Sequence, residues 1–267
     1  MANSLLLSVS ALAALVPASI LPFRRAAPCP DVLFWILLAA ALAGTAGYSA
    51  IAVGPHWNTG LSAALWVSIA VSLGLFALVS LIGREAWRLA PLLLPYLVLL
   101  GLLATVWAHA PAQQSFPPAP DAWLKIHIAI SVATYGLCTL AAVAGAAALL
   151  QERALKRKRP TALTHKLPSI ADANRLQVRL LAFSELVLGL GIATGMAEQY
   201  LRSGNLLAFE HKTLLALVAF ALIGLLLAMH RLSGLSGQRA GRLILVAYLL
   251  LTLAYPGVKF VTDVLIA

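Results

Sequence analysis

Long apolar runs are the feature that most limits how this chain can fold. A helix rises about 1.5 Å per residue, so about 20 apolar residues cross the hydrocarbon core of a bilayer. Eight runs come close to this length and are predicted to be transmembrane helices. Their spans are 5–21, 32–53, 61–82, 89–108, 124–150, 178–200, 213–229 and 243–265. We do not expect cleavage after the first run, because no basic residue precedes it and Arg24 and Arg25 follow it.

Composition supports a membrane protein. The chain is 61% hydrophobic and 10% charged, whereas soluble domains are about half apolar and about a quarter charged. We therefore predict an all-α fold: a polytopic bundle of about eight transmembrane helices forming one membrane domain over residues 1–267.

Basic residues are distributed unevenly between the two sets of loops, and this predicts the orientation. The richer set holds 15 of the 19 lysines and arginines: Arg24, Arg25, Arg84, Arg88, Arg153, Lys156, Arg157, Lys158, Arg159, Lys166, Arg175, Arg179, Arg231, Arg239 and Arg242. The other set holds Lys125, Arg202, Lys212 and Lys259. By the positive-inside rule both termini are periplasmic, in a multi-pass protein of the bacterial inner (plasma) membrane. The net charge of +10 thus reports topology, and no nucleic acid is expected as a partner.

The six histidines fall at different depths in this topology. His211 and His230 stand at opposite ends of one apolar run, roughly 28 Å apart along a helix, so they cannot share one iron. The predicted outer surface carries four of the six: His56, His109, His127 and His211. His230 lies at the inner end, and His165, in the basic loop, is given no role.

Imidazoles gathered at one depth suit axial ligation of haem iron, because each neutral ring offers a nitrogen lone pair. His127 and His211 each begin a helix beside a lysine, and these helices run in the same direction. We predict that they ligate haem iron in an outer site, with His56 as an alternative partner. His230 belongs to an inner site or anchors its helix at the headgroups. The other reading, that these histidines are interfacial side chains without a ligand, stays open and is preferred for His109.

Glu185, in "LLAFSELVLGLG", is a carboxylate inside a predicted span, and such a group is a functional candidate. It could instead reach Arg179 or Arg175, or be neutral. The sequence contains no HExxH, phosphate-binding loop or serine elbow, so we expect no enzyme. Cys29 and Cys138 lie at different depths, and we expect no disulfide between them.

Three stretches resemble the cytochrome c assembly family, the CcsA and CcmC type of haem-handling membrane proteins. "WLKIHIAISVATYGLCTLAAVAGAAALLQERALK" resembles the family's helix that begins with a ligand histidine. "DANRLQVRLLAFSELVLGLGIATGMA" is similar to the helix before its haem-binding loop. "HKTLLALVAFALIGLLLAMHRLSGLSGQRAGRLILVAYLLLTLAYPGVKF" is similar to the helices after that loop.

The resemblance is strongest over 120–265 and implies haem binding or handling in cytochrome c biogenesis. By this resemblance His127 is the external ligand position and His230 the internal one, and His211 is a replacement specific to one branch. The implied partners are the lipid bilayer, haem and other membrane assembly proteins.

Two departures from the family pattern keep alternatives open. The segment "MAEQYLRSGNLLAFEHKT" contains no tryptophan where the family has a tryptophan-rich loop, and "GVKFVTDVLIA" contains no histidine. The chain is therefore similar to the eight-helix branch that includes HemX and YpjD, in which "HKT" opens the seventh helix. The alternative is a regulatory or scaffold membrane protein that binds no haem. A third reading, a transporter using Glu185 and "GLGIATG" as a pathway, explains the outer histidines poorly.

Overall fold

The computed structural model describes residues 2–24, 29–54, 60–83, 85–109, 122–204, 211–233, 238–257 and 260–261. These residues form helices and no strand. The main helices are α1 (Ala2–Arg24), α2 (Val32–Val53), α3 (Leu61–Ile82), α4 (Ala90–Val106), α5 (Ala122–Lys156), α6 (Ile170–Ser203), α7 (His211–Ser233) and α8 (Gln238–Thr252). Within this described part, seven helices are long and apolar enough to cross a membrane, and α8 is shorter and apolar. The predicted all-α, multi-pass membrane bundle is confirmed, and the lipid bilayer is its environment.

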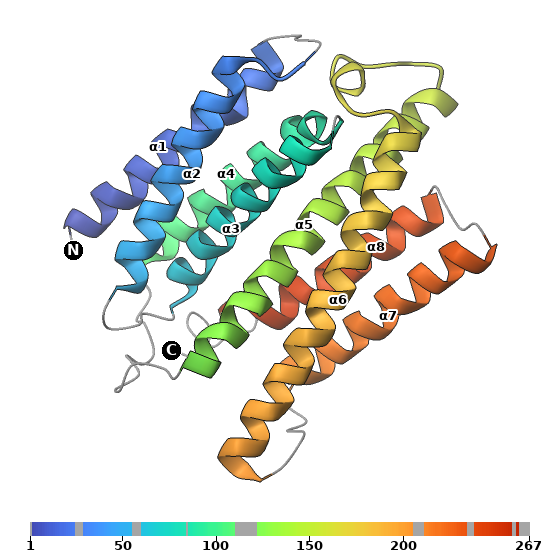
Figure 1. Ribbon diagram of the computed structural model, residues 1–267. Coiled ribbons are helices and arrows are strands. Elements are labelled where there is room, and N and C mark those ends of the chain that lie inside the picture. Colours follow the sequence, from blue (N-terminus) through green and yellow to red (C-terminus); the bar gives the residue numbers. More distant parts are fainter. Residues whose placement is uncertain are drawn as a thin grey trace.

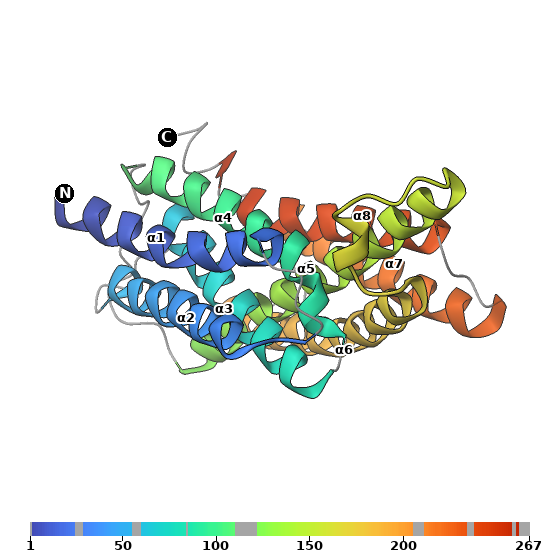
Figure 2. The same ribbon diagram turned by 90° about the horizontal axis from the view of Figure 1, so that it is seen from above.

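Consecutive helices run in opposite directions, so the start of α1 and the end of α8 lie at the same end of the bundle (Figure 1). Helices α1 and α2 lie on one side, α6 and α7 on the other, and α3, α4 and α5 between them (Figure 2). Helix α5 is the central element: 72% of its most apolar window is buried, against 17% for α7.

Helices α5 and α6 form a long antiparallel hairpin and make the most extensive contact in the bundle. Small buried residues on α5, including Ala144 and Gly145, let the backbones approach closely. At Gly145 an added methyl group would lie 3.0 Å from the side-chain oxygen of Gln177 on α6. The connecting loop is fixed by Gln151, whose Nε2 donates to the carbonyl oxygens of Thr164 (2.8 Å) and Pro168 (3.1 Å).

The end of the last helix differs from the predicted span 243–265. Regular α-helix ends at Thr252 and continues as a single π-helical turn, Leu253–Gly257. This turn contains Pro256, which has no N–H to donate to the carbonyl of Thr252 four residues earlier, so the regular hydrogen-bond pattern stops here.

Four hydroxyl groups meet between α4, α5 and α8, and we call them the tyrosine group: Tyr96, Tyr135, Thr139 and Tyr248. The hydroxyl of Tyr248 is hydrogen-bonded to Tyr96, lies 3.1 Å from the hydroxyl of Tyr135, and accepts from Thr139 Oγ1 at 3.2 Å. Side-chain hydrogen bonds of this kind join transmembrane helices. The tyrosine group therefore ties α4 to α5 and α8.

Candidate functional site

His127 lies near the start of α5, with its ring half-buried against α6. Its Nδ1 is 3.0 Å from Oγ1 of Thr194. The next residue, Gly195, faces the ring so closely that a methyl group there would lie 3.0 Å from Cε1 of His127. The imidazole therefore packs directly over the backbone of α6, at a place where any side chain larger than that of glycine would press on the ring.

Trp123 supports the same contact from one turn earlier on α5. Residues four apart share a helix face, so Trp123 and His127 both face α6. The indole Nε1 of Trp123 donates to the carbonyl oxygen of Thr194 at 3.2 Å. Glu198 lies one turn beyond Thr194 on α6, and its carboxylate interacts electrostatically with the His127 ring. Thr194 is thus held by Trp123 through its carbonyl and contacts His127 through its hydroxyl.

His211, the predicted second ligand, is the first residue of α7. Helices α5 and α7 begin at the same end of the bundle (Figure 1), and both pack against α6 and α8. His56 lies outside the described residues, and so do the side chains of His109 and His211. The two helices begin at the same end of the bundle, while a common depth of His127 and His211 and their joint ligation of one iron stay predictions.

His230 is half-buried in the last turn of α7, at the other end of the bundle from His127. Nineteen residues of helix separate it from His211, or roughly 28 Å. The two histidines therefore cannot belong to one site. An inner site at His230, or an anchoring role at the headgroups, stays a prediction.

Glu185 lies in the middle of α6, on the side that faces α7. Its Oε1 is 3.0 Å from the position that a methyl group on Gly224 would take. Its Oε2 is buried and has no hydrogen-bond partner among the described residues. Arg175 and Arg179 are exposed, and the described side chains form no ion pair with Glu185. Nine residues of helix, about 14 Å, separate Glu185 from Thr194, so this carboxyl is not part of the His127 contact.

The cysteines lie apart from this site as free thiols. Cys138 is buried on α5 with its Sγ 2.7 Å from Oγ of Ser184, and Cys29 is exposed beyond α1. In the described part of the chain, no three His, Cys, Asp or Glu side chains gather closely enough to hold a metal ion. Haem needs only one or two axial ligands from the protein, so a haem site need not contain a cluster of this kind.

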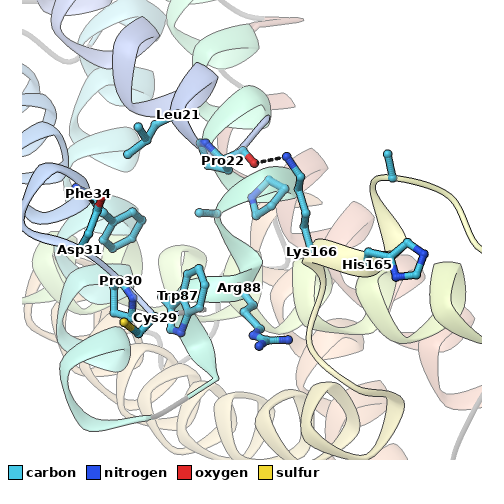
Figure 3. A pocket seen from close by; sticks show the side chains of 13 residues that line it. Leu21, Pro22, Cys29, Pro30, Asp31, Phe34, Trp87, Arg88, His165 and Lys166 are labelled. Atoms are coloured by element: carbon cyan, nitrogen blue, oxygen red, sulfur yellow. Dashed lines mark hydrogen bonds between the residues drawn. The ribbon is translucent and has the colours of Figure 1, made fainter. Parts of the chain in front are cut away.

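A cavity of about 280 Å³ lies at the opposite end of the bundle, where α1 ends and α2 begins (Figure 3). Its walls include Phe34 and Trp87. Lys166 donates from Nζ to the carbonyl oxygen of Pro22 at 2.6 Å, at the end of α1. Arg88 Nε lies 2.9 Å from a carboxylate oxygen of Glu85. Two of the cavity's cations are thus already engaged by the protein, and the cavity is separate from His127.

The family model described as "Cytochrome C assembly protein" matches residues 56–266. The chain belongs to this family. The matched region takes in α3 to α8 and therefore both His127 and Thr194. This cytochrome c assembly protein is also 52% identical, over 270 residues and the full length of both chains, to a protein of Azospirillum brasilense called "Uncharacterized 28.8 kDa protein in nifR3-like 5'region". No solved structure matches the chain. Family membership confirms the predicted resemblance and supports a role in cytochrome c biogenesis.

The sequence did not reveal that Thr194 and Gly195 contact His127, or that Trp123 donates to Thr194. One signal was available, because α5 and α6 are consecutive and antiparallel. The start of α5 must then face the end of α6, just as Cys138 meets Ser184 and Gly145 meets Gln177 further along. The "GLGIATG" stretch was therefore the segment in which to seek partners of His127.

Proposed function

We propose that this cytochrome c assembly protein binds haem during cytochrome c biogenesis, as a binding protein and not as a catalyst. The observation that supports this proposal best is the setting of His127. Its ring is half-buried at the end of the central helix and is oriented through Nδ1 by a side chain of the neighbouring helix. Histidines that ligate metals are oriented in this way, through the ring nitrogen that does not bind the metal. Bound haem would supply an iron with two axial positions for nitrogen ligands.

His127 is the first proposed axial ligand, and His211 is the second. Helices α5 and α7 start at the same end of the bundle, and α6 and α8 pack against both of them. His56 is the alternative partner of His127, and His230 is assigned to an inner site or to an anchoring role. Trp123, Thr194 and Gly195 would hold the His127 ring in its orientation before any ligand arrives.

The protein is placed in the bacterial inner membrane, with the two termini on the periplasmic side and the α5–α6 loop in the cytoplasm. The support is the positive-inside rule, applied to the basic residues beside that loop. Its other partners would be membrane proteins of the same assembly pathway. In this orientation His127 is at the periplasmic end of the bundle.

Absorption spectroscopy of the detergent-purified protein, with haem added under reducing conditions, tests the proposal. We expect a low-spin spectrum of bis-histidine type, weakened by His127→Ala and by His211→Ala. His109→Ala is the matched control at the same end of the bundle, and it should change the spectrum little.

No haem uptake, or a spectrum insensitive to both substitutions, would favour the second candidate function, a scaffold protein without haem. The specific observation that favours this alternative is the segment between α6 and α7, which lacks tryptophan where the family's haem-binding loop would stand.

A further inference from the structure

The hydrogen bonds of Thr194 determine whether its hydroxyl donates to His127 or accepts from it. A threonine hydroxyl has a single hydrogen to donate. In α6 this hydrogen is directed at the carbonyl oxygens one turn back, with Oγ1 at 2.9 Å from Leu190 O and 3.0 Å from Gly191 O. Back-bonding of this kind is common for threonine in transmembrane helices. The oxygen of Thr194 is then left as an acceptor toward Nδ1 of His127, 3.0 Å away.

We propose that Thr194 selects the tautomer of His127, accepting a hydrogen bond from Nδ1–H and so leaving Nε2 without hydrogen. A neutral imidazole carries one N–H, so hydrogen on Nδ1 makes Nε2 the nitrogen with a lone pair. Thr194 is a positioning residue in this assignment, because it acts through His127.

The opposite arrangement, in which Thr194 donates to His127, would break hydrogen bonds within α6. If the Thr194 hydroxyl donated to Nδ1, it would give up both carbonyl partners in its own helix, and Nε2 would carry the hydrogen. Nε2–H cannot ligate iron. The two arrangements therefore predict opposite tautomers, and the tautomer can be read without any ligand.

The experiment uses the full-length protein, labelled with ¹⁵N-histidine and kept in detergent at pH about 8, above the ordinary imidazole pKa of about 6.5. Two-bond proton–nitrogen correlations show which ring nitrogen carries hydrogen, and loss of signals in His127→Gln assigns the His127 ring. We expect Nδ1–H in the wild type and in Thr194→Ser, which keeps the hydroxyl. Thr194→Val keeps the shape but removes the acceptor, and it should lose the preference for Nδ1–H.

Thr105→Val is the matched control. Thr105 is another half-buried threonine that donates to a carbonyl one turn back, at 2.8 Å from Gly101 O, in a different helix. It should leave the His127 tautomer unchanged. Nε2–H in the wild-type protein would overturn the assignment, and so would an unchanged tautomer in Thr194→Val. If Thr194→Val fails to fold, the wild-type and Thr194→Ser spectra still decide.

A second readout, haem titration, rests on the proposed function. Loss of an outer partner of a metal-ligating histidine typically costs roughly 10–100-fold in affinity, and we expect this loss for Thr194→Val. Thr194→Ser and Thr105→Val should bind haem as the wild type does. Absence of haem uptake by a wild type with Nδ1–H would refute the proposed function and leave the tautomer assignment standing. Wild-type haem binding unaffected by Thr194→Val would overturn the positioning role.

Discussion

Glu185 is a residue whose chemistry depends on its depth in the bundle. It lies in the middle of α6 with one carboxyl oxygen buried and without a hydrogen-bond partner among the described residues. A charged carboxylate at the centre of a membrane helix costs about 3 kcal/mol on insertion scales. Since neither Arg175 nor Arg179 pairs with it in the described structure, the neutral form is the one that this environment tolerates.

We predict that Glu185→Gln leaves assembly intact, because glutamine keeps the shape of the neutral acid. Thermal unfolding of the purified protein, monitored by size-exclusion chromatography after heating, should give a melting temperature close to that of the wild type. Glu185→Lys is the control, since it places a fixed charge against Gly224 and should lower the melting temperature. Failure of Glu185→Gln to assemble would instead indicate a charged carboxylate with a cationic partner.

At the scale of elements, the sequence predicts helix positions better than helix lengths. The spans 32–53 and 61–82 coincide with α2 and α3, where Asp31 caps one start and Gly54 and Gly83 follow the ends. Helix α5 continues to Lys156 and helix α6 begins at Ile170, so both are longer than their predicted apolar spans. The additional turns are polar. A search for apolar runs cannot detect helix that continues beyond the hydrocarbon region.

The α5–α6 hairpin also shows why the candidate site was only partly predictable. The depth of His127 follows from counting residues along an apolar run. Its contact with Thr194 and Gly195 depends on how α5 and α6 are rotated about their axes, and α6 has polar and apolar residues on all sides. No residue pattern on α6 alone marks the face that meets the His127 ring.

Two glycines on α6 allow this contact to be tested. We predict that Gly195→Ala weakens haem binding, because its methyl group would lie 3.0 Å from Cε1 of His127 and displace the ring from Thr194. Gly191→Ala, one turn away, meets Ile130 at an ordinary 3.4 Å and should bind haem normally. Both substitutions gain up to about 1 kcal/mol of helix propensity, so propensity alone does not distinguish them. Titration with haem measures the difference.

Equal haem affinity for the two alanine variants would contradict the close packing of His127 on α6. Where neither variant nor the wild type takes up haem, the ¹⁵N spectrum of the His127 ring provides the comparison. The ring signals should shift in Gly195→Ala and stay in place in Gly191→Ala.

At the scale of the whole molecule, charge divides the bundle into two unlike ends. The end that holds the α5–α6 loop carries the described arginines and lysines from Arg153 to Arg179, and the other end holds His127 and the start of α1. The alternation of helix directions and the loop charges are thus mutually consistent. This part of the fold was predictable, because charge bias and helix count are both properties of the sequence.

Reporter fusions test which end faces the cytoplasm. We predict that a reporter fused after Arg159 is active only as a cytoplasmic protein such as a fluorescent protein. One fused after Ala267 should be active only as a periplasmic enzyme such as alkaline phosphatase. Activity of phosphatase at Arg159 would reverse the orientation and place His127 at the cytoplasmic end.

The tyrosine group has a consequence for the order in which the protein is made. Tyr96 and Tyr135 enter the membrane with α4 and α5, but the hydroxyl of Tyr248 that bonds to both arrives with the last helix. Until then the hydroxyls of Tyr96 and Tyr135, 3.4 Å apart, lack the Tyr248 hydroxyl, and the surrounding lipid chains offer no hydrogen-bond partner in its place. A growing chain therefore carries an unfinished polar centre until α8 is inserted. The complete hydrogen-bonded tyrosine group can form only after the last helix of the bundle is in the membrane.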